Sequence, residues 1–472
     1  MLVYNTKRGI GMNFIDKKVS DIKLAYIGGG SMGWAWTFMA DLSLEDKISG
    51  TIRLYDINEL AADKNRIIGN ILSDDPNRIG SLKYETVKSL EEALTGADFV
   101  VISILPGTFE EMRSDVHAPE KYGIYQPVGD TAGPGGLMRA LRTIPMFVEI
   151  AEAIKKYSPE AWVINYSNPL TLCVQTLYLV FPGIKAFGCC HEVFNTQKLL
   201  TAMCEEKLGI DKIDRREIVV NVMGLNHFTW FDRASYQGYD LFPMYREFVD
   251  EYYETGYPRG NDGYLTNPFA CAHRVKFDLF LRYGLIAAAG DRHLAEFMPP
   301  TYLKDPQTAA SWRFALTPVE YRIDDLHNRQ NKSRRLISGE EQLDLEPSGE
   351  EGILLMKSLL GLERTISNVN IPNTGQLPNL PYGTVVETNA LFERDHISPI
   401  YSGNVPANVK ALIDPHISIN TDILKAALTC DRELAFKAFQ ADPLMTIGEE
   451  AARKLFDEML ENTNNYLPKG WF

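Results

Sequence analysis

The amino-acid sequence predicts an α/β protein: a doubly wound parallel sheet followed by a second, α+β domain that ends in helices. Over the first 208 residues, short apolar runs typical of buried strands alternate with helical patterns. After about residue 210 the pattern changes to longer, loosely alternating strands and then to mostly helical segments. The chain of 472 residues is also too long for one small core, which favours two domains.

The composition is that of a globular protein that avoids polyanions. The chain is 45% hydrophobic and 23% charged, and its formal net charge is −14 with a pI near 5.2. No basic run offsets this charge, which argues against nucleic acid or an anionic membrane as the main partner. No apolar run approaches the roughly 18 residues of a membrane helix.

Cysteine use and the N-terminal segment indicate the compartment. The six cysteines show no paired framework, and Cys189 and Cys190 are adjacent, which suits reducing conditions. Residues 1–21 are mixed and polar, unlike a signal peptide, and we expect them to be a dispensable leader. These observations predict a cytoplasmic protein.

A glycine loop follows the first buried strand, residues 24–27, and leads into a helix at residues 34–44. Its form, G-x-G-x-x-G, lets the chain turn tightly and lets pyrophosphate oxygens approach the N–H groups at the helix start. The next strand ends in Asp56, 23 residues beyond Gly33, close to the spacing of about 20 for an acid that binds ribose hydroxyls. An acid here favours NAD over NADP, although Asn58 and Lys64 could weaken the preference.

The sequence therefore predicts a Rossmann-type, NAD-binding domain over residues 22–208. The residues expected to contact the dinucleotide are Gly28, Gly30, Ser31, Met32, Gly33 and Asp56.

Polar side chains at the carboxyl ends of successive strands are expected to share one crevice with the glycine loop. Asp130 lies in a glycine-rich segment, residues 129–136, directly before a long helix, and is either a general acid or an Asx-turn residue. Asn168 ends the strand at residues 161–166, and Cys190 ends the following one.

Cys190 lies on a turn between the strand at residues 184–187 and a helix at residues 193–208. The positive end of a helix dipole favours thiolate, the form that binds metal or attacks a substrate. The alternative is a small buried hydrophobic residue. A second metal ligand must come from elsewhere, and His227, in a glycine-led turn, is the best candidate of the eight histidines unless it has only a structural role.

A group of titratable residues follows a helical run at residues 277–289. It begins with Asp291, Arg292 and His293. Such a group behind a helix end forms either a site or an exposed, solvated terminus.

Taken together, these motifs resemble glycoside hydrolase family 4. The resemblance rests on the glycine loop, residues 129–136, the Asn-Pro pair at 168–169, the Gly-x-Cys-His sequence at 188–191 and the Gly-x-Asn-His sequence at 224–227. It extends over nearly the whole chain, through residues 377–381 and 441–443. Members of that family keep NAD bound and need a divalent metal, commonly manganese.

The resemblance implies roles for several residues. Cys190 and His227 would be the metal ligands, and residues 209–472 would form an α+β catalytic, metal-binding and oligomerisation domain. The Cys-His-Glu-Val sequence at 190–193 is similar to that of the α-galacturonidase subgroup, with α-glucosidase or α-galactosidase activity as the alternatives. Relatives commonly form homodimers or homotetramers.

The family's chemistry is a redox-elimination-addition sequence rather than two-carboxylate hydrolysis. NAD transiently oxidises carbon 3 of the sugar, which acidifies the proton on carbon 2, and the metal stabilises the resulting enediolate. A base removes that proton, the aglycone leaves, water adds, and the hydride returns.

By resemblance, Asp130 would be the acid and Asp291 the base, with Tyr283 as the fallback base. Asn168 would bind sugar hydroxyls. A galacturonide also carries a carboxylate, for which the candidate partners are Arg292, His293 and Arg139.

Two readings compete with this one. A lactate- or malate-type NAD-dependent dehydrogenase would have a similar nucleotide domain, but a cysteine–histidine pair and a long second half suit metal chelation better. A non-catalytic NAD sensor would leave Cys190, His227 and Asp291 without a purpose.

Overall fold

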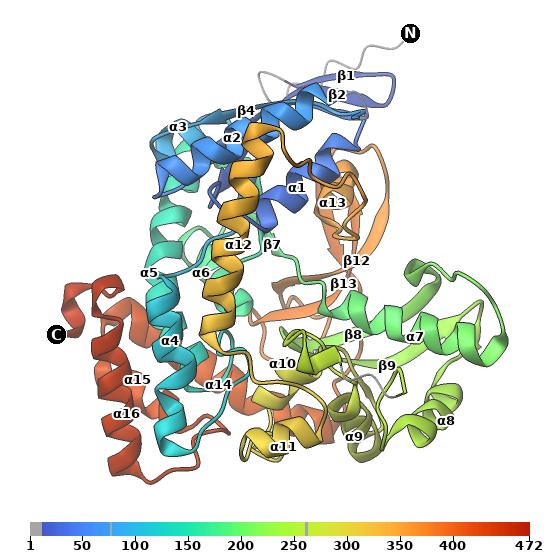
Figure 1. Cartoon of the computed structure of the whole chain (residues 1–472), viewed down its shortest axis with the longest axis vertical. Coiled ribbons are helices and arrows are strands. Elements are labelled where there is room, and N and C mark those ends of the chain that lie inside the picture. Colours follow the sequence, from blue (N-terminus) through green and yellow to red (C-terminus); the bar gives the residue numbers. More distant parts are fainter. Residues whose placement is uncertain (1–11, 76–77, 260–262) are drawn as a thin grey trace.

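The computed structural model describes residues 12–75, 78–259 and 263–472. A large mixed sheet begins at the top of Figure 1, where β2 and β4 lie. A small antiparallel sheet lies at the lower right, near β8 and β9, with helices of its own. The predicted α/β class with C-terminal helices is confirmed.

The large sheet contains ten strands within the described residues, in the order β14-β13-β12-β7-β6-β5-β2-β3-β4, with β1 paired to β2. The strands from β7 to β4 are mutually parallel, and β12 to β14 add an antiparallel edge. The strands are β1 (Asn13–Ile15), β2 (Lys18–Ile27), β3 (Ile48–Tyr55), β4 (Ser81–Thr86), β5 (Phe99–Ile102), β6 (Trp162–Asn165), β7 (Lys185–Gly188), β12 (Thr365–Pro372), β13 (Val385–Glu393) and β14 (His396–Pro399).

Helices cover both faces of the parallel strands, because the central strands β2, β5, β6 and β7 end in runs that are almost entirely buried on both sides. On one face, Phe147 and Ile154 of α5 pack with Val100 and Val163 of the sheet. On the other face α1, α2 and α13 pack around Tyr26. The helices of this part are α1 (Trp34–Ser43), α2 (Glu59–Asp74), α3 (Leu90–Leu94), α4 (Phe109–His117), α5 (Gly133–Tyr157), α6 (Leu170–Val180), α7 (Glu192–Leu208) and α13 (Gly352–Leu359).

The small sheet joins β8 to β9, and β9 to β10 and β11, all antiparallel. Its aromatic face packs against α5 and α14 through Trp230, Leu141 and Ile417. This half contains β8 (Ile218–Leu225), β9 (Phe228–Tyr236), β10 (Tyr239–Asp240), β11 (Ile286–Ala287), α8 (Phe242–Tyr252), α9 (Arg274–Tyr283), α10 (Asp291–Glu296), α11 (Pro306–Ser311), α12 (Val319–Ser338), α14 (Ala407–Thr429), α15 (Arg432–Gln440) and α16 (Glu449–Asn462).

The structure differs from the sequence prediction in three places. Part of the segment predicted as a leader forms the β1–β2 hairpin, while residues 1–11 lie outside the described residues. The strands β12 to β14 come from the second half of the chain yet complete the first sheet, so the boundary at residue 208 divides the chain but not the sheets. The helix predicted at residues 277–289 is wrong beyond Tyr283, because Gly284 ends α9 in a left-handed conformation and β11 follows.

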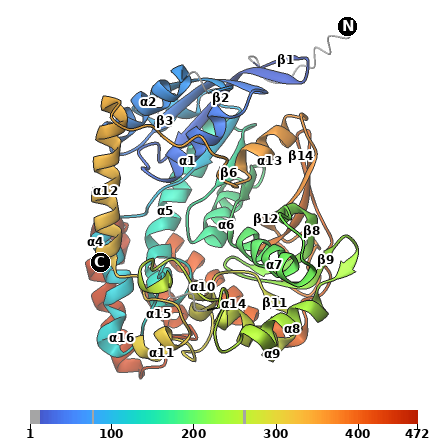
Figure 2. The same cartoon turned by 45° about the vertical axis from the view of Figure 1, so that its right-hand side comes forward.

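Helix α12 links the two halves. It lies along α2 and α4 in both views (Figures 1 and 2). Its Arg329 donates a hydrogen bond to the carbonyl of Met32 in the glycine loop. None of the helices in the described ranges is both long and apolar enough to cross a membrane.

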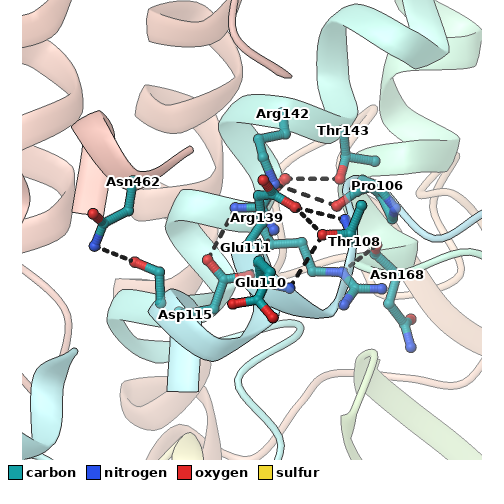
Figure 3. A network of polar contacts seen from close by, with 12 residues as sticks. Pro106, Thr108, Glu110, Glu111, Asp115, Arg139, Arg142, Thr143, Asn168 and Asn462 are labelled. Carbon is teal, nitrogen blue, oxygen red and sulfur yellow. Dashed lines mark hydrogen bonds and ion pairs between the residues drawn. The ribbon is translucent and has the colours of Figure 1, made fainter. Parts of the chain in front are cut away.

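A buried ion pair fixes α4 against α5 below the sheet (Figure 3). The Arg142 guanidinium donates to both carboxylate oxygens of Asp115, at 2.9 and 2.6 Å, and to the carbonyl of Pro106. Both side chains of the pair are 1% exposed. The same helix α5 carries Arg139 toward the loop of Asn168, so this pair also sets the position of the site.

We expect Asp115→Ala to lower the free energy of unfolding by about 3–5 kcal/mol, because Arg142 would remain buried without its counter-charge. Urea unfolding followed by circular dichroism measures the change. Arg113→Ala is the control: this side chain pairs with Glu110 and Glu320 at the surface, and its loss should cost less than about 1 kcal/mol. Equal losses of unfolding free energy in the two variants would show that the buried Asp115–Arg142 pair is no more important to stability than a surface pair.

Candidate active site

Three side chains form a cluster with ligand geometry for a metal ion: Asp130, His227 and His293. One potential ligand atom of each lies within 4.8 Å of the other two. The two imidazole rings are stacked with centroids 4.1 Å apart. Asp130 comes from the loop before α5, His227 from the β8–β9 turn and His293 from α10, so the cluster joins both halves of the chain.

Hydrogen bonds around Asp130 determine the form of His227. The Thr131 hydroxyl donates to one Asp130 oxygen at 2.7 Å, and the Asn168 amide donates to the other at 3.1 Å. Because the hydroxyl has only one hydrogen, its 3.2 Å contact with Nδ1 of His227 requires that Nδ1 be the donor. The other ring nitrogen, Nε2, then carries the lone pair that a metal ion needs.

The protonation states also suit a cation. Burial alone would raise the pKa of Asp130, but His293, His227 and Arg139 outweigh it and hold that pKa well below its usual range. Burial lowers the pKa of His227 to about 3 and also lowers the pKa of His293. At neutral pH the cluster is therefore one carboxylate and two neutral imidazoles, the forms that coordinate divalent metals.

Cys190, predicted as a metal ligand, is not part of the group formed by Asp130, His227 and His293. Its thiol is within hydrogen-bonding reach of the Glu192 N–H and of the side chain of Asn226, the residue before His227. The predicted thiolate is not the resting state, because burial and the carboxylates of Glu387 and Glu192 raise the pKa of Cys190 well above its usual value. The helix dipole is outweighed, and a bound cation would be needed to deprotonate the thiol.

The two predicted bases lie elsewhere. The Asp291 carboxylate accepts hydrogen bonds from the N–H groups of Val275 and Lys276, in the first turn of α9. Burial raises its pKa to about 6, although Lys276 and these N–H groups oppose the shift. The Tyr283 ring packs edge-on against Trp230. Neither residue belongs to the group formed by Asp130, His227 and His293.

Several groups in the site carry no strong sequence signal. Glu192 accepts a 2.5 Å hydrogen bond from the Gly290 N–H, and its pKa is lowered to about 2 because His293, His191 and His227 outweigh the effect of burial. The sequence placed His293 with the substrate, but the structure places it among the potential metal ligands. The Thr131 hydroxyl contacts two members of the cluster, which its place directly after Asp130 hinted at.

The glycine loop and Asp56 lie together at the carboxyl end of the parallel strands. Gly28 has φ +94°, and a Cβ there would lie 2.0 Å from the carbonyl oxygen of Ser103. The Asp56 carboxylate accepts hydrogen bonds from Gly30 and Asn58 N–H groups, at 2.9 and 2.8 Å. Beside the loop is a cavity of about 380 Å³, lined by Met32, Asn58, Leu60, Ala61, Lys64, Gln330 and Arg334.

Glu296 holds the loop that carries Asp130. One carboxyl oxygen accepts hydrogen bonds from the N–H groups of Val128 and Gly129, at 2.6 and 3.0 Å. Burial raises the pKa of Glu296 to about 8, so this carboxyl group keeps its proton at neutral pH.

The fold and the cluster define a class: a dinucleotide-binding α/β protein with a candidate metal centre where its two halves meet. Residues 23–206 match the model of family 4 glycosyl hydrolases, and residues 222–445 match that family's C-terminal domain. The chain belongs to glycosyl hydrolase family 4, which confirms the resemblance and excludes the lactate- or malate-type dehydrogenase.

Individual relatives cover the whole chain. A protein of Lachnoclostridium phytofermentans named alpha-galacturonidase is 61% identical, over 98% of this chain and 100% of its own. The crystal structure of glucosidase lplD from Bacillus subtilis is 51% identical with a TM-score of 0.89, over 93% of this chain and 100% of its own. A 6-phospho-alpha-glucosidase from gut microorganisms, solved with NAD and Mn²⁺, shares the fold with 20% identity and a TM-score of 0.80. The match covers 95% of this chain and 99% of that one.

The raised pKa of Glu296 predicts a pH-dependent stability. Between about pH 5 and pH 8 the folded protein holds a proton that the unfolded chain has released, so this group makes the free energy of unfolding fall as the pH rises. Glu296→Gln keeps an oxygen that can accept both N–H bonds and removes the titration. We expect this slope of the free energy of unfolding to be smaller in the variant by up to about 1.4 kcal/mol per pH unit.

Urea unfolding across that pH range, compared between the wild type and the variant, measures the slope. Glu450→Gln on an exposed helix end is the control. A slope unchanged in Glu296→Gln would show that Glu296 does not hold its proton.

Proposed function

We propose that the protein is an NAD- and divalent-metal-dependent α-galacturonidase. The observation that carries the proposal is the 61% identity, across the full length, to a relative named alpha-galacturonidase. The cluster of Asp130, His227 and His293 and the glycine loop support the cofactor requirements. A cytoplasmic location and a homodimer or homotetramer stay predictions.

The residues present fit both cofactors. The cavity beside Met32 is lined by Asn58, whose N–H donates to Asp56, and its lining would hold the adenosine half of NAD. Asp130, His227 and His293 would hold the cation, manganese by resemblance, with Cys190 as a further ligand from the sequence prediction. When bound, NAD exchanges a hydride with the sugar and the cation stabilises negative charge on sugar oxygens.

The chain's own groups divide the remaining work. Asp130 is a poor proton donor at neutral pH because its pKa is held low, so we propose it as a cation ligand in place of the acid predicted from the sequence. Asn168 has one buried amide oxygen without a partner, Oδ1, which can accept a sugar hydroxyl. Asp291, with its pKa near the working pH, remains the predicted base, although its oxygens cap α9 in this structure.

The activity itself is tested with 4-nitrophenyl α-D-galacturonide. We expect nitrophenol release only when both Mn²⁺ and NAD are present, because oxidation and reduction occur within one turnover. The absorbance of NADH should not accumulate during the reaction. Steady NADH production would indicate a net dehydrogenase, and faster cleavage of the α-glucoside or α-galactoside would indicate one of the alternative specificities.

His293→Ala tests the ligand set that the structure defines. We expect it to weaken Mn²⁺ binding at least about 10-fold in isothermal titration calorimetry, since one of three ligands is lost. His396→Ala, an exposed histidine on β14, should leave Mn²⁺ affinity unchanged. Loss of affinity in Cys190→Ser and His227→Ala but not in His293→Ala would instead favour the ligand pair predicted from the sequence.

A further inference from the structure

Three arginines converge on the space around Asp130. Arg139 comes from α5, Arg292 from α10 and Arg322 from α12. Arg139 and Arg292 are almost fully buried and Arg322 is half-buried. Burial lowers the pKa of all three guanidinium groups, and each is also influenced by the charge of Asp130.

None of these arginines forms an ion pair within the described part of the chain. Arg139 donates to the Asn168 carbonyl at 3.2 Å. Arg292 donates through Nη2 to the Pro127 carbonyl and the Thr317 hydroxyl, while its buried Nε has no partner. For Arg322 the described residues provide no hydrogen bond, only the ring of Phe269.

Four carboxyl groups influence Arg292 and Arg322: Asp130, Glu192, Glu296 and Asp325. None of them forms an ion pair with either arginine among the described residues, because Glu192 accepts a hydrogen bond from the Gly290 N–H and Asp325 pairs with Arg329. Asp130 already accepts hydrogen bonds from Thr131 and Asn168 and faces Arg139. Glu296 keeps its proton at neutral pH because burial raises its pKa to about 8. Arg292 and Arg322 are thus desolvated cations without a bound carboxylate, which is costly unless a ligand supplies one.

Phe269 packs against both of these arginines. The guanidinium carbons of Arg292 and Arg322 lie 5.1 and 5.3 Å from the centre of its ring. The ring is 47% exposed, and Tyr321 packs edge-on against it. The ring therefore contacts the half-buried guanidinium of Arg322 and the buried guanidinium of Arg292, and their planar N–H forks match the geometry of a carboxylate.

We propose that Arg322, together with Nε of Arg292, binds the carboxylate of the sugar residue that is cleaved. The inference rests on the proposed function and identifies how that site selects a uronide. It assigns this role to a residue of α12 that the sequence analysis did not single out, and it moves His293 to the metal cluster. Arg292 directly precedes His293 of the metal cluster in α10, which favours a carboxylate on the cleaved sugar rather than on its neighbour.

Arg322→Gln tests the proposal, with Arg335→Gln as control because Arg335 lies on the same helix and pairs with Glu341 at the surface. For 4-nitrophenyl α-D-galacturonide, we expect kcat/KM to fall about 10- to 100-fold, mainly through KM, as for loss of a charge-assisted hydrogen bond. Mn²⁺ affinity and any cleavage of the neutral α-galactoside should stay within about twofold, since only the uronide carries the charge. Arg322→Lys should fall between the wild type and Arg322→Gln, because it keeps the charge but not the fork.

Thermal protection by D-galacturonate, with D-galactose as the neutral comparison, gives a readout that needs no turnover. We expect galacturonate to protect the wild type and Arg335→Gln but not Arg322→Gln. If the wild type cleaves no galacturonide, the proposed function fails. The carboxylate site is still supported in that case if galacturonate protects the wild type but not Arg322→Gln. The inference would be overturned if Arg322→Gln lost kcat/KM equally on the galacturonide and the neutral galactoside. It would also be overturned if kcat/KM fell only for digalacturonate.

Discussion

The site depends on one buried carboxylate, Asp130, that stays ionised between the two halves of the molecule. Thr131 and Asn168 each donate to one of its oxygens, and Arg139 supplies a fixed positive charge from α5. Without these donors, burial would favour the neutral acid. The neutral imidazoles of His227 and His293 beside an ionised carboxylate then make a place where a divalent cation is favourable.

Two neighbouring acids of α10 show how much the environment decides. Asp291 and Glu296 are both buried, and burial raises both pKa values, to about 6 and about 8. Asp291 lies near Lys276 at the start of α9, which moderates the shift, whereas Glu296 lies near the charge of Asp130, which adds to it. One acid therefore titrates close to neutral pH, and the other is a proton-holding support for the loop of Asp130.

Buried arginines are the second feature of the site. Arg142 has a bound carboxylate in Asp115 and serves the packing of α4 on α5. Arg292 and Arg322 have none, and both contact the ring of Phe269, which is partly exposed. The contrast separates a structural arginine from arginines whose counter-charge comes with the ligand.

Strand periodicity and glycine spacing are local properties, so they were enough to predict the parallel sheet, the glycine loop with Asp56, and the placement of Asn168 and Cys190 at strand ends. Family membership also followed from local motifs in order. Only the tertiary structure joined β12 to β14 to the first sheet and brought His293 to Asp130 and Arg322 to Phe269. These pairings link residues 53 to 182 positions apart, which no linear pattern records. The protonation states of the site residues likewise follow from burial and from neighbouring charges.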